Sequence, residues 1–298
     1  MTNPKVQEYP VVWILAGACT GCSVSVLNSV SPDIKNVLVD EVIPGKHLNL
    51  RFHPTVMAGQ GDIALKVLKD TEKNDAGKYI LVVDGAIATA ENGIYCMAAD
   101  EGGHEITMAQ RVEGLARNAL AIIAIGTCAA YGGIAGSKPN PGGFVGTETF
   151  LKMKGINKPL INVPGCPPHP DWFVGTVASV MLAGLPTADQ IDEYKRPKAF
   201  YGNLIHENCP RRGYFDEGKF AKKFGEPGCL NELGCKGPVT HADCPKRGWN
   251  NNVNWCINGG APCIGCASPH FPDYLMPVYQ KLDEQKIPAI GTPRKEVK

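Results

Sequence analysis

The sequence has almost no excess charge of either sign and no apolar run long enough to cross a bilayer. Its 298 residues carry 30 Lys and Arg against 29 Asp and Glu, a formal net charge of +1. Nucleic acids and anionic membranes attract clustered positive charge, so this balance argues against both as partners. The longest apolar stretch, residues 172–185, is too short for a transmembrane segment.

The amino terminus also lacks the features of an export signal. It has neither the apolar core of a secretory signal peptide nor the arginine pair of a twin-arginine leader. Taken as written, the sequence predicts a cytoplasmic protein, and a periplasmic one if such a leader has been removed.

Cysteine is too scarce for a disulfide scaffold and too frequent to be incidental. The 12 cysteines are about 4% of the chain, well below the level of short disulfide-stapled proteins. Glycine (34) and proline (24) together make roughly a fifth of the residues, against an average nearer 12%. The sequence therefore indicates a globular protein that is rich in turns and whose cysteines have a specific role.

The apolar pattern divides the chain into two parts. Strands are expected where short β-rich runs occur, at residues 11–15, 37–39, 79–83, 120–125 and 160–163. Helices are expected between several of these runs, at residues 23–30, 62–69 and 108–117. This alternation predicts an α/β domain with a mostly parallel sheet at residues 1–185. Residues 186–298 have few apolar runs and hold seven of the cysteines, so we expect an irregular second domain there.

Four cysteines follow directly on predicted strands of the first domain: Cys19, Cys22, Cys128 and Cys166. Ligands of an open parallel sheet bind at the carboxyl ends of its strands, so we expect these thiols to converge. Glycine beside each of them allows the backbone to approach a bulky ligand. Four thiolates suit an iron–sulfur cluster or zinc.

Simpler interpretations of these cysteines remain open at this point. The C-x-x-C spacing of Cys19 and Cys22 also suits a thioredoxin-like redox pair, and a helix beginning at Cys22 would favour its thiolate. A lone Cys128 or Cys166 would most simply be a buried structural thiol. Neither interpretation explains why cysteines occur directly after three different predicted strands.

The second domain carries two further groups of ligand-type residues. The first is His206, Cys209, Cys229 and Cys235, in which imidazole would replace one thiolate, as in some iron–sulfur centres. The second is Cys244, Cys256, Cys263 and Cys266, whose C-x2-C end would also suit a zinc ribbon. The two common ferredoxin spacings are absent, and disulfides are the weaker alternative without an export signal.

The three groups use eleven cysteines and one histidine, four ligands each, and leave only Cys96, which we expect to be a buried free thiol. No acid–base or nucleophile arrangement is visible, so no catalytic residue is assigned in this chain. The pattern predicts an electron relay whose chemistry takes place elsewhere.

Several segments together resemble the small subunit of nickel–iron hydrogenases, in the family's order and over nearly the whole chain. They are C-T-G-C-S-V-S-V-L-N, F-H-P-T-V-M-A, G-T-C-A-A-Y-G-G-I, N-V-P-G-C-P-P-H-P-D-W, I-H-E-N-C-P, L-G-C-K-G-P and P-C-I-G-C. The resemblance implies a flavodoxin-like first domain and a second domain that holds clusters. It also implies a large partner subunit with the nickel–iron centre that splits H2, and an acceptor such as a cytochrome or membrane subunit.

Carried over by position, the resemblance assigns three clusters. They are a proximal 4Fe–4S cluster on Cys19, Cys22, Cys128 and Cys166, a distal 4Fe–4S cluster on His206, Cys209, Cys229 and Cys235, and a medial cluster on Cys244, Cys263 and Cys266. Electrons would pass from proximal through medial to distal. They would leave near His206, where Arg211, Arg212, Lys222 and Lys223 would steer an acceptor or simply form a solvated charged face.

Three departures from the family pattern are informative. Many members have proline where Cys256 stands and hold a medial 3Fe–4S cluster, so the extra thiolate favours 4Fe–4S, as in the nickel–iron–selenium subgroup. C-T-G-C-S-V and residues 270–273 resemble that subgroup as well. Gly21 and Gly133 stand where oxygen-tolerant members have extra cysteines, which implies an ordinary proximal cluster. Ala18 replaces a common glutamate, so no proton-handling role carries over.

Two other functions compete with this one. The quinone-reducing subunit of a respiratory complex resembles the first domain and its proximal cluster, but it does not need the cysteines of the second domain. A zinc-stabilised binding module without redox function would use the same thiols.

Overall fold

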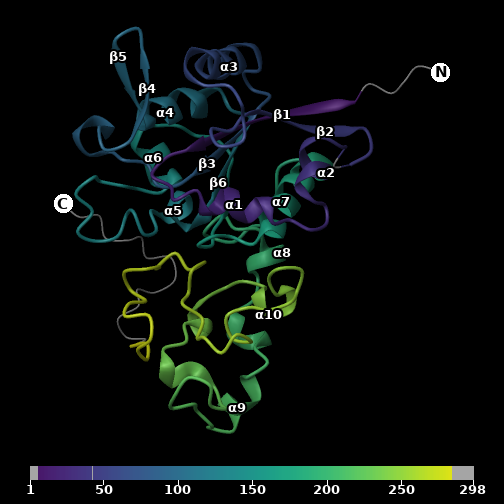
Figure 1. Cartoon of the computed structure of the whole chain (residues 1–298), viewed down its shortest axis with the longest axis vertical. Coiled ribbons are helices and arrows are strands. Elements are labelled where there is room, and N and C mark those ends of the chain that lie inside the picture. The colour runs from purple at the N-terminus through teal and green to yellow at the C-terminus, as the bar shows by residue number, and fades with distance from the viewer. Residues whose placement is uncertain (1–5, 42, 284–298) are drawn as a thin grey trace. The chain divides into compact units, whose positions relative to one another are not determined.

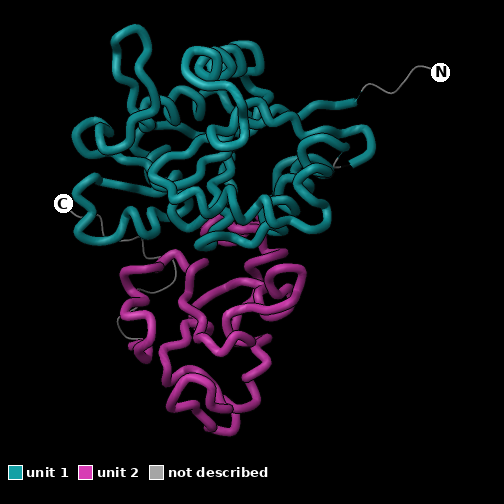
Figure 2. Tube along the Cα trace, in the orientation of Figure 1, with its two compact units in different colours: residues 1–187 teal, residues 188–298 magenta. Residues whose placement is uncertain are grey.

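The computed structural model describes residues 6–41 and 43–283 and divides the chain into two compact units, Met1–Thr187 and Ala188–Lys298 (Figure 2). The sequence placed the boundary after residue 185.

A five-stranded parallel sheet forms the centre of the first unit (Figure 1). The strands lie in the order β2-β1-β3-β6-β7, and each neighbouring pair is parallel. Numbered along the chain, this is the order 2-1-3-4-5 of flavodoxin-like folds, which confirms the predicted fold class. The strands are β1 (Gln7–Leu15), β2 (Lys46–Phe52), β3 (Ile80–Asp84), β6 (Ala121–Ile125) and β7 (Leu160–Val163).

Helices cover both faces of this sheet, so its central strands β3 and β6 are apolar except for Asp84 at the end of β3. All residues of β3 and β6 are buried. Alternate residues of each strand point to opposite faces. One face packs against α3 (Gly61–Asn74), α4 (Met108–Asn118) and α6 (Thr147–Met153), through a core that includes Leu81 and Leu115.

The opposite face is covered by α1 (Gly21–Leu27) and α7 (Pro170–Ala183). Trp13 of β1 packs edge to face against Phe173 of α7, with ring centroids 5.0 Å apart. The α7 helix begins at a His169 cap with proline in its first turn, the position where proline costs least. The remaining elements of this unit are α2 (Ile34–Leu38), η1 (Ala90–Gly93), α5 (Gly126–Tyr131) and the hairpin of β4 (Met97–Glu101) and β5 (His104–Thr107).

One predicted strand is wrong. Residues 37–39, expected to be extended, belong to α2 and its carboxyl-terminal cap. A reciprocal capping box between Asp33 and Asn36 starts this helix, and local capping outweighs the strand preference of two valines. The second strand of the sheet is instead β2, whose polar residues hide it from a search for apolar runs.

The second unit contains only short helical turns in the part of the chain that the structure describes, and the longest has five residues. Strand pairing is limited to isolated bridges. The turns are α8 (Lys198–Tyr201), η2 (Ile205–Asn208), α9 (Arg212–Asp216), η3 (Leu230–Leu233), η4 (Gly237–Val239) and α10 (Cys244–Arg247). Among residues 6–41 and 43–283, no helix has the length and apolar character needed to cross a membrane.

Candidate metal centres

The first group of cysteines lies at the carboxyl-terminal edge of the parallel sheet. After β1 the chain passes Gly17, which bridges to Ala86 beyond β3, and reaches Cys19. Thr20, with a φ of 64°, turns the backbone into α1, where Cys22 is the second residue. Cys19 is exposed and Cys22 is partly buried.

The two other cysteines of this group follow the neighbouring strands β6 and β7. Cys128 lies within α5, which begins directly after β6. Gly165 precedes Cys166 and is joined to Thr127 by two hydrogen bonds: the Thr127 amide donates to the Gly165 carbonyl, and the Gly165 amide donates to the Thr127 hydroxyl, both at 2.9 Å. These bonds hold the segments that carry Cys128 and Cys166 side by side.

Hydrogen bonding and electrostatics bring α1 to the same place. The Ser25 hydroxyl of α1 donates to the Pro168 carbonyl at 2.7 Å, two residues beyond Cys166. Burial raises the pKa of the Cys22 thiol, the Asp84 carboxyl raises it next, and the thiols of Cys128 and Cys19 add to the effect. The structure therefore brings the four sequence-predicted residues to one edge of the sheet.

Glycine at two positions is required by the approach of sulfur atoms. A Cβ atom on Gly126, whose φ is +85°, would lie 2.5 Å from Cys22 Sγ. A Cβ atom on Gly133, whose φ is +49°, would lie 2.7 Å from Cys128 Sγ. Nonbonded carbon atoms prefer separations of roughly 3.5–4.0 Å, so neither position accommodates a side chain without displacing a cysteine.

Sequence reasoning missed Asp84, the last residue of β3. Its carboxylate accepts a hydrogen bond of 3.1 Å from the Ser23 hydroxyl and is 1% exposed. Burial raises its pKa to about 6. Burial and this carboxyl favour the thiol of Cys22 and so oppose the thiolate-favouring effect expected of the α1 amino end. The signal was available, since Asp84 ends a buried strand at the same edge.

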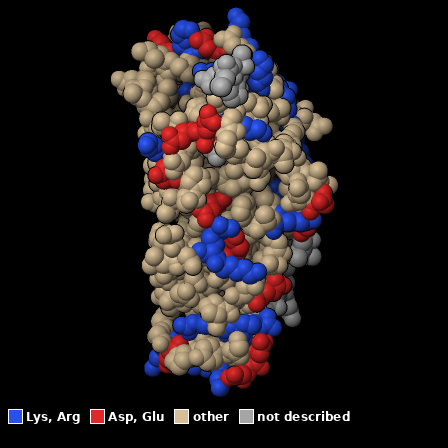
Figure 3. Space-filling model, turned by 90° about the vertical axis from the view of Figure 1, so that its right-hand side faces the viewer, with Lys and Arg blue, Asp and Glu red and all other residues tan. Residues whose placement is uncertain are grey.

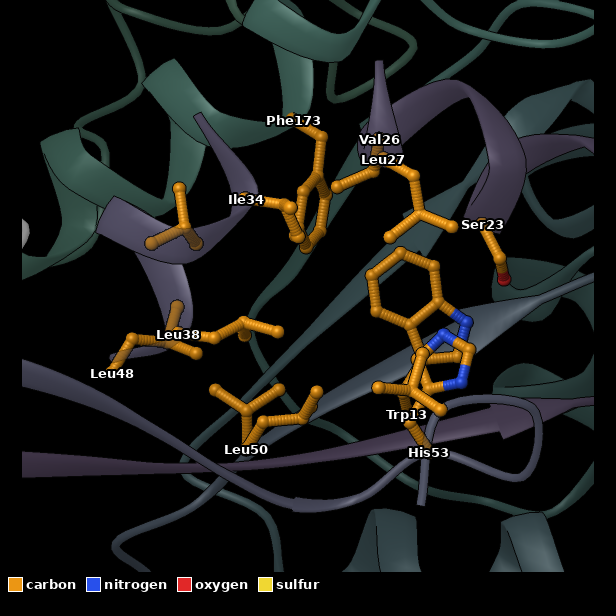
Figure 4. Close-up of a pocket in the computed structure, with 13 residues that line it drawn as sticks. Trp13, Ser23, Val26, Leu27, Ile34, Leu38, Leu48, Leu50, His53 and Phe173 are labelled. Atoms are coloured by element: carbon orange, nitrogen blue, oxygen red, sulfur yellow. The ribbon is translucent and has the colours of Figure 1, made fainter. Parts of the chain in front are cut away.

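A small apolar cavity of about 40 Å³ lies beside this group, between α1, α2 and the β1–β2 edge of the sheet (Figure 4). The indole of Trp13 lies against the imidazole of His53, with centroids 4.9 Å apart. Burial lowers the pKa of His53 to about 4. The Ser23 hydroxyl at the rim is bonded to Asp84, so polar groups do not converge here as they do in a substrate site.

The second group lies in the loops of the second unit. Burial raises the pKa of the Cys235 thiol, and the nearby thiols of Cys209 and Cys229 raise it further. A Cβ atom on Gly237 would lie 3.4 Å from Cys235 Sγ and 3.7 Å from the His206 amide nitrogen, which places the histidine backbone close to that cysteine.

His206 carries the clearest sign of a missing partner. Its Nε2 atom is buried, with no hydrogen-bond partner among the described residues. The ring packs edge to face on Phe215 at 4.6 Å, and burial lowers its pKa. A buried, neutral and unpartnered imidazole nitrogen is suited to bind a metal.

The third group has two buried members, Cys244 and Cys263. Burial raises the pKa of Cys244, and the thiols of Cys266 and Cys256 add to this effect. Cys263 is 5% exposed, and its pKa is raised by burial and then by its neighbours, Cys266 among them. Cys256 is the exposed member of the group, on the turn after the buried Trp255.

Cys96 lies apart from all three groups, in the turn before β4, where its amide donates to the Gly93 carbonyl. It is only half-buried, whereas a buried thiol was expected.

The two arginines beside the second group already have partners. Arg212 pairs with Asp216 at 2.8 Å, and Arg211 donates to the carbonyls of Glu226 and Gly228. On the face that Figure 3 shows, blue basic and red acidic side chains are interspersed.

The residues fit iron–sulfur clusters by their chemistry: converging thiols, glycines where sulfur atoms approach the backbone, and a buried orphan imidazole nitrogen. Among the described residues, no three His, Cys, Asp or Glu side chains are arranged to hold a single metal ion.

Two family models match different parts of the chain. Residues 201–279 match the carboxyl-terminal domain of the NiFe/NiFeSe hydrogenase small subunit. Residues 19–180 match the 20 kDa subunit of NADH ubiquinone oxidoreductase.

Individual proteins are similar over both units. The chain is 47% identical over 282 residues to the periplasmic NiFeSe hydrogenase small subunit of Desulfomicrobium baculatum, which covers 92% of this chain and 87% of that protein. It is 41% identical over 275 residues to the periplasmic NiFe hydrogenase small subunit 1 of Nitratidesulfovibrio vulgaris, covering 91% and 81%.

A solved structure of the reduced, active Ni-Fe-Se hydrogenase from Desulfomicrobium baculatum is also similar. It has a TM-score of 0.86 and 45% identity, and covers 92% of this chain and 100% of that chain.

Proposed function

The chain belongs to the family of NiFe and NiFeSe hydrogenase small subunits, and we propose that it carries electrons between the large subunit and an external acceptor through three iron–sulfur clusters. The observation that carries this proposal is the gathering of thiols into three groups. The proposed ligands are Cys19, Cys22, Cys128 and Cys166 for a proximal cluster, His206, Cys209, Cys229 and Cys235 for a distal one, and Cys244, Cys256, Cys263 and Cys266 for a medial one.

When bound, each cluster would supply a site that takes up and releases one electron. The chain supplies the thiolates, buries most of them at least partly and directs amide groups at some of the sulfur atoms. The Arg211 amide donates to Cys209 Sγ and the Gly237 amide to Cys235 Sγ, both at 3.4 Å. Such hydrogen bonds favour the more negative, reduced form of a cluster.

We propose proximal and distal 4Fe–4S clusters, and a medial 4Fe–4S cluster with Cys256 as the fourth ligand. The proximity of Cys256 to Cys244 supports this assignment. The raised thiol pKa values do not oppose it, because a bound metal deprotonates a coordinating thiol.

The deciding experiment is anaerobic purification of the chain with its partner, followed by iron, sulfide, nickel and zinc analysis. For three 4Fe–4S clusters we expect roughly twelve sulfides and twelve irons per small subunit, besides the nickel and iron of the large partner. Zinc without sulfide would refute the relay and favour the zinc-stabilised module. Recovery without a large nickel-bearing partner would contradict the electron path.

The match of residues 19–180 to the 20 kDa ubiquinone oxidoreductase subunit supports a second candidate, a quinone-reducing cluster subunit. That match stops before the second unit, which matches the hydrogenase family instead. H2-dependent reduction of a viologen dye would favour the hydrogenase. Reduction of a quinone by a complex that does not oxidise H2 would favour the alternative.

We propose a protein acceptor, such as a cytochrome or a membrane subunit, that docks near His206. Since Arg212 is paired and Arg211 is bonded to carbonyls, steering would depend on Lys222 and Lys223. Salt dependence of the acceptor's reduction rate tests this contribution. Cell fractionation distinguishes between the cytoplasm and the periplasm, the two compartments that the sequence leaves open.

A further inference from the structure

One lysine of the second unit is buried almost completely, which is rare for this residue type. Lys236 follows the distal ligand Cys235 and is 1% exposed. Its Nζ donates to the Gln280 carbonyl at 2.7 Å and lies 3.5 Å from the Pro277 carbonyl. Within residues 6–41 and 43–283, no carboxylate forms an ion pair with it. A buried ammonium group is costly unless other negative groups compensate for it.

The backbone of Lys236 adjoins proposed ligands of two different groups. Its electrostatic neighbours are Cys235, a proposed distal ligand, and Cys263, a proposed medial ligand. The Lys236 amide also donates to the Cys263 carbonyl at 2.7 Å. Lys236 therefore lies where the second and third groups meet, and one hydrogen bond joins their backbones.

The position is fixed from several sides. The Thr240 hydroxyl donates to the Lys236 carbonyl at 2.7 Å. A Cβ atom on Gly265 would lie 2.4 Å from Leu275 Cδ1 and 3.1 Å from the Lys236 Cβ atom, so the lysine packs closely against this glycine. Because these contacts hold the lysine in place, its charge can act electrostatically on both groups without a change in the position of the side chain.

We propose that Lys236 is a positioning residue whose buried positive charge raises the reduction potentials of the medial and distal clusters together. This inference rests on the proposed function. A cluster ligated by thiolates becomes more negative when it gains an electron, and a fixed cation nearby favours that form. Because one charge lies beside a ligand of each cluster, it shifts both potentials in the same direction and preserves the driving force for the single electron that passes between them.

The test is a redox titration of the complex with its partner, followed by EPR of each cluster. Lys236→Gln removes the charge and keeps an amide donor, Lys236→Met also removes the donor, and Lys236→Arg keeps the charge. In both neutral variants the reduction equilibrium constants of the medial and distal clusters should fall at least about tenfold, or about 59 mV for one electron. The proximal potential should stay unchanged, and Lys236→Arg should stay close to the wild type.

Lys219→Gln is the matched control, because Lys219 lies in the same unit with its side chain 66% exposed and paired with Glu217. It should leave all three potentials unchanged. Unmoved medial and distal potentials in the neutral variants would overturn the inference while leaving the proposed function intact. Loss of clusters in both neutral variants but not in Lys236→Arg would also overturn it, since the lysine would then be needed for assembly rather than tuning. Absence of iron–sulfur signals from the wild type would overturn the proposed function as well.

Discussion

Gly126→Ala provides a direct test of the proximal site, because the new methyl group meets a proposed ligand. Gly126 lies between β6 and Cys128 with a φ of +85°, which favours glycine. Forcing a side chain into a left-handed backbone costs about 1–3 kcal/mol. The new Cβ atom would also lie 2.5 Å from Cys22 Sγ, roughly 1 Å inside the normal contact distance, and overpacking of this kind costs a further 1–3 kcal/mol or so.

Gly103→Ala is the matched control. Gly103 has a φ of +86°, lies on the exposed turn between β4 and β5, and has no atoms within 4 Å of a Cβ atom built there. It incurs the backbone cost alone, so the difference between the two variants isolates the overlap with Cys22. Each kcal/mol lowers the melting temperature by about 2–4 °C in a domain of this size, so Gly126→Ala should melt roughly 2–12 °C below the control.

If Cys22 moves to relieve this overlap, a proposed cluster ligand is displaced. Iron analysis of Gly126→Ala should then show about four irons fewer per chain than the control, with the proximal EPR signal lost and the other two retained. A Gly126→Ala protein with the melting temperature and iron content of Gly103→Ala would refute the close approach of Cys22 to this turn.

Three further changes test other parts of the molecule. Cys256→Pro should give a 3Fe–4S EPR signal in the oxidised protein, and a wild type that already shows this signal would contradict Cys256 as a ligand. His206→Ala removes the imidazole whose Nε2 is buried without a partner, so the distal signal should disappear while the other two signals stay; three intact signals would contradict the assignment. Burial lowers the pKa of His53 to about 4 in the folded chain, so the unfolded chain binds a proton at this residue at a higher pH than the folded chain does. The unfolding free energy should therefore fall by about 3 kcal/mol as the pH drops from 6.5 towards 4. His53→Phe should lose less unfolding free energy than the wild type between pH 7 and pH 5 in denaturant titrations, and an equal loss would contradict this linkage.

The fold of the first unit was readable because its central strands are buried on both faces. Such strands appear as continuous apolar runs, and four of the five strands of the sheet were expected at nearly their observed positions. The strand β2 was missed because its residues are only partly buried, while α2 depends on a capping box that a search for apolar runs does not weigh.

For the first set, the sequence by itself predicted that Cys19, Cys22, Cys128 and Cys166 converge, because the rule that ligands bind at strand ends applies before any coordinates are known. The two sets of the second domain were predicted from residue type and order alone. The sequence did not determine the charge environment of those thiols. Asp84 and Lys236 are far in sequence from several of the cysteines that they influence, and only folding brings a buried carboxyl beside Cys22 and a buried ammonium beside Cys263. Burial is a property of the packed chain, and it decides how strongly these charges act.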